Sequence, residues 1–260
     1  MKLLAHKQTG SGEDTLVFIH GFCENQSIWK DFVPHFVQTH QVLTLDLGGF
    51  GESKDLLPQP CSIEALAEQI AELLEHLDIK KANIVAHSLG GYVSLALAEK
   101  YPHFVKSLCL FHSTALADSP EKQTIRNKVI DFVQKVGVNQ YIDSFVAPLF
   151  YAKRSQELSE EIKFVEEIGK KTPLETILAV LAAMRDRKDR LEVLKNASFP
   201  ILYIIGKEDA AVSFESYQEQ IKAIPRVQSL ILKETAHMGM FERPKETLEA
   251  VQKFVQNQKI

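Results

Sequence analysis

The sequence predicts an α/β fold with a mostly parallel, twisted sheet and helices on both of its faces. Two observations support this prediction. Short runs rich in Val, Ile and Leu recur along the 260-residue chain, and they lack the alternating polar residues of a half-exposed strand. Such runs are typical of strands that are buried on both faces of a parallel sheet. Segments with helical periodicity lie between most of them and are long enough to cross from one parallel strand to the next.

Each element of this fold has a local pattern in the sequence. Strands are expected at residues 15–19, 42–46, 83–86, 105–111, 200–205 and 228–232. Crossover helices are expected at residues 63–77, 89–101, 214–224 and 244–255. Ser62 precedes the first of these helices, and its hydroxyl can accept a hydrogen bond from the N–H groups of the first turn. Pro102 ends the second helix, because proline cannot continue it.

Residues 114–196 interrupt this alternation with helical patterns in place of a buried strand. Ser119-Pro120 predicts an N-cap, followed by proline in the first turn, for a helix over 121–136. Thr172-Pro173-Leu174-Glu175 fits a capping box ahead of a helix over 174–184. A structureless loop of this length is implausible in a compact domain. We therefore expect a helical cap, or lid, at 114–196, inserted before the last two strands, and an α/β core formed by 1–113 and 197–260.

Composition excludes several classes of function. The chain has 30 Lys and Arg against 34 Asp and Glu and no basic stripe, so we expect no nucleic-acid partner. No apolar stretch reaches the ~18 residues of a membrane span, and the first residues turn polar too early for a secretory leader, so we expect no membrane association. Three scattered cysteines, Cys23, Cys61 and Cys109, do not form a disulfide framework and favour a cytoplasmic protein. Nothing in the sequence fixes the oligomeric state.

The segment His87-Ser88-Leu89-Gly90-Gly91 lies between a predicted strand and a predicted helix. A serine in such a sharp turn has a strained backbone and a hydroxyl that stands clear of the sheet. The residues two positions to either side must be small, and here they are Ala86 and Gly90. The pattern A-x-S-x-G differs from the usual G-x-S-x-G by one methyl group. On these residues alone, Ser88 could also be an ordinary helix N-cap.

Five segments lie at or after the ends of predicted strands. In chain order they are His20-Gly21-Phe22, the stretch from Asp46 to Ser53, the turn around Ser88, Gly206-Lys207-Glu208-Asp209 and Ala236-His237-Met238. Together, in this order, they resemble the α/β-hydrolase fold superfamily. Within it the chain is most similar to the small bacterial esterase-like serine hydrolases with a helical cap. The resemblance covers nearly the whole chain and is weakest over 114–196.

This resemblance implies a catalytic triad. Ser88 would be the nucleophile, His237 the general base and later the acid, and Asp209 the carboxylate that orients the imidazole. The backbone N–H groups of Phe22 and Leu89 would form the oxyanion hole. The chemistry agrees, because a serine hydroxyl needs a neighbouring base and a histidine with a pKa of about 6.5 can act as one near neutral pH.

Other polar and aromatic residues near these motifs are expected to be structural. His87 should point away from the site. His20 should brace the oxyanion loop, which begins at His20-Gly21 and contains Phe22. Asp46 should hold a turn, and Cys23 should be a small buried residue. A family variant places the acid after the 105–111 strand, but this chain has no carboxylate at 112–114. The charge run containing Arg185, Arg187 and Arg190 is expected to be a solvated helix end. Most members of one aromatic and Met set are expected in the core, with a minority in the pocket wall: Trp29, Tyr141, Phe145, Phe150 and Met184.

These observations predict a serine hydrolase that cleaves a small carboxylic ester, or a related acyl substrate, through an acyl-enzyme. No sequence motif for a metal or nucleotide is present, so no cofactor is expected. One alternative is a carbon–carbon bond hydrolase or lyase-type enzyme on the same triad. Its relatives tend to bind acidic substrates with lid arginines, so Arg126, Arg154 or Arg185 would have to face the pocket. A ligand receptor with slow turnover is a second alternative on the same fold.

Overall fold

The computed structural model describes residues 2–256 and contains a seven-stranded, mostly parallel sheet in the order β1-β3-β2-β4-β5-β6-β7. The predicted fold class is confirmed, and each of the six expected strands is present with ends within two residues of the prediction. The strands are β1 (His6–Thr9), β2 (Asp14–Ile19), β3 (His40–Leu45), β4 (Ala82–His87), β5 (Val105–Phe111), β6 (Ile201–Gly206) and β7 (Val227–Leu232).

The additional strand, β1, forms one edge of the sheet and pairs antiparallel with β3, with His6 opposite Leu45. Its four residues are polar, and three of them are exposed. An edge strand with so little buried surface has no apolar run. This explains why the sequence pattern did not predict it.

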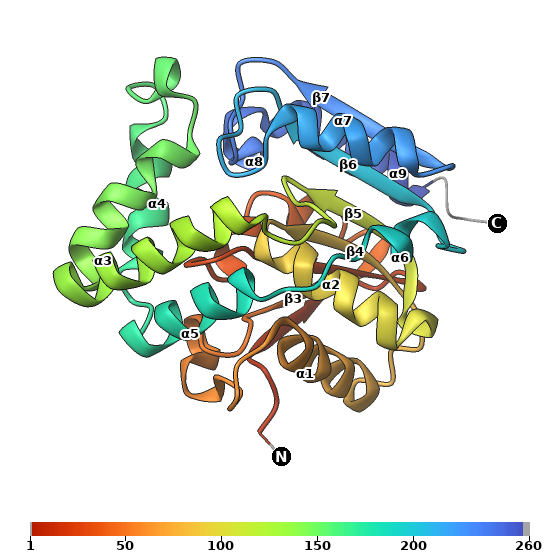
Figure 1. Ribbon diagram of the computed structural model, residues 1–260. Helices are drawn as coiled ribbons and strands as arrows, with labels where there is room; N and C mark the ends of the chain where they lie inside the picture. The colour runs from red at the N-terminus through yellow and green to blue at the C-terminus, as the bar shows by residue number, and fades with distance from the viewer. Residues whose placement is uncertain (1, 257–260) are drawn as a thin grey trace.

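Helices cover both faces of the sheet. Figure 1 shows α1, α2 and α7 in front of the sheet and α9 behind it. The Ser62 hydroxyl accepts a hydrogen bond from the Ala65 N–H at 3.0 Å and so caps α1 as expected. Short 3₁₀ turns connect several elements. The helices are α1 (Ile63–His76), α2 (Leu89–Lys100), α3 (Pro120–Phe145), α4 (Ser159–Gly169), α5 (Leu174–Arg185), α6 (Leu191–Lys195), α7 (Phe214–Ala223), α8 (Gly239–Glu242) and α9 (Pro244–Gln256).

Between β5 and β6 the chain forms α3 to α6, and Figure 1 shows α3, α4 and α5 gathered at one side of the sheet. We call residues 114–196 the lid. Ser119 caps α3 as predicted, but the helix continues past residue 136 and is interrupted at Gly137, where φ is 78°. The predicted capping box at Thr172 is wrong, because Pro173 occupies the N-cap of α5 and no side chain caps that helix. Thr172 is buried.

The core positions the ends of β4, β5 and β6 rigidly, because the residues of these strands are almost all buried. On one face, an aromatic cluster fixes the strands with tilted and edge-to-face ring contacts. Its members are Phe18, Trp29, Phe32, Phe36 and Phe111. Within residues 2–256, no helix combines the length and apolar character that crossing a membrane requires.

Candidate active site

Ser88 occupies the sharp turn between β4 and α2 with the strained backbone that was expected, at φ 46° and ψ −113°. Two contacts from the end of β5 hold the turn. The Ser88 N–H donates to the Phe111 carbonyl at 3.0 Å, and the Ser113 hydroxyl donates to the Ser88 carbonyl at 2.7 Å. A Cβ on Gly90 would lie 2.7 Å from the His20 carbonyl oxygen, which explains why this position needs glycine.

The structure brings the three predicted triad residues together. His237 Nε2 lies 2.9 Å from the Ser88 hydroxyl, and His237 Nδ1 lies 2.8 Å from Asp209 Oδ2. The other oxygen of Asp209 accepts hydrogen bonds from the N–H groups of Ala211 at 2.8 Å and Val212 at 3.1 Å. The carboxylate is therefore fixed in the orientation that faces the imidazole. This arrangement can pass a proton from the hydroxyl to His237.

The electrostatics of the site favour a charged imidazolium. Burial by itself would raise the pKa of Asp209, but His237 and His112 outweigh it and hold that pKa well below its usual range. Burial would likewise lower the pKa of His237, yet Asp209 raises it above its ordinary value. The Asp209 carboxylate therefore stabilises His237 in the state that follows removal of the Ser88 proton.

His112, directly after β5, is a second histidine beside Asp209. It is fully buried, has a positive φ of 48°, and places Nδ1 3.4 Å from Asp209 Oδ2. Burial lowers the pKa of His112 to about 4, so the ring is neutral near pH 7. His112, Asp209 and His237 offer ligand atoms within 4.8 Å of one another, a spacing that the His237–Asp209 hydrogen bond accounts for.

A buried carboxylate that sequence analysis missed holds the backbone around His237. Glu242 Oε1 accepts hydrogen bonds from the N–H groups of Ala236 at 2.9 Å and Met238 at 3.2 Å. The His237 N–H itself donates to the Leu149 carbonyl of the lid at 2.8 Å. The position of the imidazole therefore depends on α8 and on the lid. Glu242 has no sequence signature, because a glutamate in a short helical segment is common.

Of the expected oxyanion donors, Leu89 directly follows Ser88 and Phe22 lies in the loop after β2. Leu89 is the first residue of α2, where N–H groups have no intrahelical acceptor. The Phe22 side chain lines the cavity described below, as expected, whereas the Leu89 side chain is completely buried and does not. Under the oxyanion loop, His20 Nδ1 donates to the Gly21 carbonyl at 2.7 Å and Nε2 accepts from the Leu47 N–H at 2.9 Å. This is the bracing role predicted for His20.

Asp46 and Cys23 also have the structural positions predicted for them. Asp46 accepts hydrogen bonds from the N–H groups of Gln26 at 2.8 Å and Glu52 at 2.9 Å, so it holds the turn after β3. Cys23 is buried, and burial raises the pKa of its thiol well above its usual value. A thiol in this state is a poor nucleophile.

His87 does not point away from the site, so that expectation was wrong. Its Nε2 lies 3.0 Å from the carbonyl oxygen of His237, and its Nδ1 lies 2.9 Å from Glu24 Oε2. Both side chains are almost fully buried. The turn at Ser88 places His87 beneath the catalytic loop, where it contacts backbone atoms of that loop.

A cavity of about 490 Å³ opens beside Ser88 and His237. Its wall is largely apolar, and α3 contributes Ile125, Val129 and Phe132 from one helical face. Tyr141, Phe145 and Met184 also line it, whereas Trp29 and Phe150 are buried in the core. More of this predicted set therefore reaches the pocket than expected. The cavity can hold a small apolar group against the serine.

The cavity also contains charged side chains at its lid end, namely Lys122, Arg126 and Asp118. Arg126 Nε lies 2.7 Å from Asp118 Oδ2. Of the three lid arginines considered above, Arg126 lines the cavity. Arg154 instead bonds to Glu157 and to the Glu242 carbonyl, and Arg185 bonds to Asp186 and Asn127.

The expected solvated helix end at 185–190 is wrong for two of its three arginines. Arg187 is buried, lies 2.7 Å from Asp118 Oδ1 and stacks on the Tyr92 ring. Arg190 is buried between Glu99 at 3.0 Å and Glu64 at 2.6 Å. These partners come from other elements, so the local charge pattern gave no sign of the burial.

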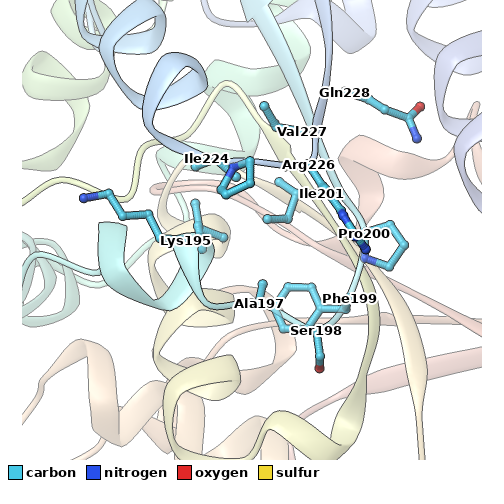
Figure 2. A pocket seen from close by; sticks show the side chains of 12 residues that line it. Lys195, Ala197, Ser198, Phe199, Pro200, Ile201, Ile224, Arg226, Val227 and Gln228 are labelled. Carbon is cyan, nitrogen blue, oxygen red and sulfur yellow. The ribbon is translucent and has the colours of Figure 1, made fainter.

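A second hollow, of about 550 Å³, lies at the amino ends of β6 and β7 (Figure 2). Phe199, Pro200 and Ile224 form much of its wall, with Lys195 and Arg226 as its charged groups. The lining residues include no histidine, cysteine or carboxylate. Because β6 separates it from Asp209, which follows the opposite end of that strand, this hollow has no contact with the triad.

Comparison with known proteins identifies the family of the chain. Residues 14–244 match the family model for the alpha/beta hydrolase fold, and the chain belongs to this family. It is 28% identical over 256 residues to a pimeloyl-(acyl-carrier protein) methyl ester esterase of Aeromonas hydrophila, covering 95% of this chain and 96% of that one. A solved thermophilic esterase from Thermogutta terrifontis superimposes with a TM-score of 0.91 at 28% identity, covering 99% of this chain and 94% of the esterase.

A further relative is longer than the matched region. The chain is 32% identical over 234 residues to the dihydrolipoyllysine-residue acetyltransferase component of an acetoin cleaving system from Pseudomonas putida. The match covers 90% of this chain and 61% of that protein, so the chain spans about three fifths of its length. Relatives named esterase, lipase and hydrolase support a hydrolase enzyme.

Proposed function

We propose that this protein is a serine hydrolase that cleaves a small carboxylic ester through an acyl-enzyme, with Ser88, His237 and Asp209 as its triad. The observation that carries the proposal is the continuous chain of hydrogen-bond contacts from the Ser88 hydroxyl through His237 to Asp209, at 2.9 and 2.8 Å. Relatives named as esterases support the same reaction class.

In the proposed acylation step, the Ser88 hydroxyl oxygen attacks the ester carbonyl while His237 Nε2 takes its proton. The N–H groups of Phe22 and Leu89 donate to the oxyanion of the tetrahedral intermediate. When the intermediate collapses, the carbon–oxygen bond to the alcohol breaks and His237 returns the proton to the leaving alcohol. In deacylation, His237 removes a proton from water, the resulting nucleophile attacks the acyl-enzyme, and the acid and free Ser88 are released.

The size and the apolar wall of the cavity favour a small substrate that has an apolar part. Apolar side chains of α3 and α5 line it together with Ser88, so the acyl or alcohol group would lie against the lid. On this proposal, residues 114–196 act as the lid and 1–113 with 197–260 as the catalytic core. The three cysteines are free, which is consistent with the reducing cytoplasm proposed as its location.

One observation favours the carbon–carbon bond hydrolase or lyase-type alternative. Arg126 lines the cavity and is placed to meet an acidic group of a substrate. It already bonds to Asp118, and Arg187 bonds to the same carboxylate. Lys122 is a third cation near Asp118, so this end of the cavity has a net positive charge. Turnover of a dienone acid in place of simple esters would support this alternative.

The test is steady-state hydrolysis of p-nitrophenyl acetate, butyrate and octanoate by the wild type and Ser88→Ala, with fluorophosphonate labelling in parallel. We expect turnover and labelling by the wild type, and loss of both in the variant. The relative rates on the three esters measure the acyl length that the cavity accepts. Full activity of Ser88→Ala on every ester would overturn the proposal. Labelling of Ser88 without ester turnover would favour the alternative.

A further inference from the structure

We propose that Glu24 and His87 form a buried, charged positioning pair that fixes the oxyanion loop relative to the loop carrying His237. This inference rests on the proposed serine hydrolase function. Neither residue touches the hydroxyl of Ser88. Both act through the backbone, at one end on Gly21 and at the other on His237.

The geometry of the pair connects three separate segments. Glu24 Oε2 accepts a hydrogen bond from the Gly21 N–H at 2.6 Å, and the same oxygen lies 2.9 Å from His87 Nδ1. His87 Nε2 lies 3.0 Å from the His237 carbonyl oxygen. Gly21 directly precedes Phe22, the proposed oxyanion donor. The pair therefore joins the loop after β2, the end of β4 and the loop after β7 in one line of contacts.

The hydrogen bonds of Glu24 and His87 define the charge state of the pair. A carbonyl oxygen only accepts, so His87 Nε2 must carry a hydrogen to bond to His237. The contact between Nδ1 and Glu24 Oε2 needs a second hydrogen. Because Oε2 also accepts from the Gly21 N–H, it has the character of an ionised carboxylate, and the second hydrogen belongs on His87. The pair is then an imidazolium and a carboxylate, each satisfied by the other.

The surroundings agree with an ionised pair. Burial alone would raise the pKa of Glu24, but His87 and the Gly21 N–H outweigh it and lower that pKa. The His237 and His112 rings lie 5.0 and 6.3 Å from the His87 ring between centroids. Glu24 supplies the negative charge that the imidazolium needs in this cluster. Taking either partner away would leave an uncompensated buried charge, or force its neutralisation.

The pair also gives a reason for glycine at position 21. A Cβ there would lie 2.7 Å from His87 Nδ1 and 2.8 Å from Glu24 Oε2. A side chain at this position would separate the two charged groups. The pair thus requires the glycine of the His20-Gly21 motif.

The first experiment uses the wild-type protein, with ¹⁵N-labelled histidine and NMR detection of the His87 ring, assigned with His87→Gln. We expect both ring nitrogens to carry a hydrogen, because each faces an acceptor, Glu24 Oε2 or the His237 carbonyl oxygen. A His87 ring with one unprotonated nitrogen would overturn the charged pair. The protonation state is read on the wild-type enzyme, and His87→Gln serves only to assign the signal.

The second experiment measures kcat and KM on p-nitrophenyl butyrate for Glu24→Gln, His87→Gln and the double variant. We expect each single variant to lose about tenfold or more in kcat, because a small displacement of reacting groups is costly. The change in KM should be much smaller, since ground-state binding is retained. The double variant should be close to the worse single variant, not the product of the two losses.

An inhibitor separates positioning from general loss of stability. A trifluoromethyl ketone forms a tetrahedral oxyanion on the serine, so its affinity should fall in parallel with kcat. Ser107→Ala is the matched control, because Ser107 donates to Asn83 in another fully buried pair, at 2.7 Å, at the opposite end of β4. It should lower the melting temperature and leave kcat unchanged.

The outcomes distinguish the two proposals. Normal kcat in Glu24→Gln and His87→Gln, with only a lower melting temperature, would overturn the positioning pair. Multiplicative losses in the double variant would also overturn it, because they would show independent roles. If Ser88→Ala kept full activity in the same assay, the proposed function would fail first. Loss of activity in Ser88→Ala with normal pair variants would remove the further inference alone.

Discussion

His237 Nδ1 and Asp209 Oδ2 are 2.8 Å apart, and the same carboxylate oxygen lies 3.4 Å from the Nδ1 of His112. Two histidines thus face one buried carboxylate, and they differ in their proton affinity. The pKa of His237 is raised above its ordinary value, whereas burial lowers the pKa of His112 to about 4. Near pH 7, His237, which contacts Ser88, is therefore the better base of the two histidines.

Asp209→Asn should lower kcat by about four orders of magnitude, as expected when the histidine loses the carboxylate that orients it. It should also move the pH profile. Activity requires neutral His237, so wild-type kcat/KM should rise with pH around a midpoint above about 6.5. Without the carboxylate that raises the pKa of His237, this midpoint should shift to lower pH. Steady-state rates from acid to alkaline pH measure both effects.

Glu208→Gln is the control for this prediction. Glu208 directly precedes Asp209 and accepts the Thr235 N–H at 3.0 Å, a bond that a glutamine oxygen can also accept. Its pH midpoint should match the wild type. An unchanged midpoint in Asp209→Asn would show that this carboxylate does not set the pKa of the base.

Gly90→Ala should destabilise the protein by about 1–3 kcal/mol, because the added methyl group overpacks a rigid site. Its Cβ would lie 2.7 Å from the His20 carbonyl oxygen and 2.9 Å from that of Ile19. Both are backbone atoms, so no flexible side chain can move aside. Urea unfolding measures the change, with Lys100→Ala, at the exposed end of the same helix, as a control. A variant as stable as the wild type would contradict this account of the turn.

Arg187→Met should cost about 3 kcal/mol of unfolding free energy, because Asp118 Oδ1 and the Met184 carbonyl lose their buried donor, while Arg126 still pairs with the other oxygen of Asp118. Arg187 lies 2.7 Å from Asp118 Oδ1, and both side chains are almost fully buried. Arg185→Met is the matched control from the same charge run. Its partner Asp186 is exposed, so the loss should be below about 1 kcal/mol. Equal losses in the two variants would contradict the difference in burial.

Arg126→Gln tests the positive end of the cavity. On mono-p-nitrophenyl glutarate, whose acyl group carries a carboxylate, we expect kcat/KM to fall about tenfold, the equivalent of 1.4 kcal/mol. On p-nitrophenyl butyrate, which is neutral, it should change little. Arg185→Gln is the control, because Arg185 bonds outside the cavity. An equal fall on both esters would show that Arg126 acts through the fold and not on substrate charge.

Much of the fold follows from local patterns. The strands that are buried on both faces are visible as apolar runs, and Ser62 and Ser119 mark the beginnings of α1 and α3. The missed elements differ in cause. β1 is polar and exposed, so it has no apolar run. α4 buries Ile162, Val165 and Ile168 at helical spacing, so its pattern was present in the sequence and was not separated from the rest of the lid.

The candidate site likewise has residues that the sequence predicted and residues that it did not. Ser88 and Asp209 follow the buried strands β4 and β6, and His237 follows the largely exposed edge strand β7. Motif order and strand position predicted their meeting. Their supports were not predictable, because Glu24 and His87 are 63 residues apart and Glu242 reaches the Tyr151 N–H across 91 residues. Contacts over such separations leave no spacing pattern in a single sequence. The burial of Arg187 has the same cause, since its partner Asp118 lies on another segment.

The Leu149 carbonyl, which accepts the His237 N–H, divides the lid into two parts with different freedom to move. The segment after Gly137 leads to Leu149 and cannot leave the core without releasing the backbone of the base. The segment before it, 120–136, carries the cavity-lining Ile125, Val129 and Phe132, and a Cβ at Gly137 would contact nothing within 4 Å. We therefore expect substrate exchange by bending at Gly137, a motion that keeps the base aligned throughout turnover.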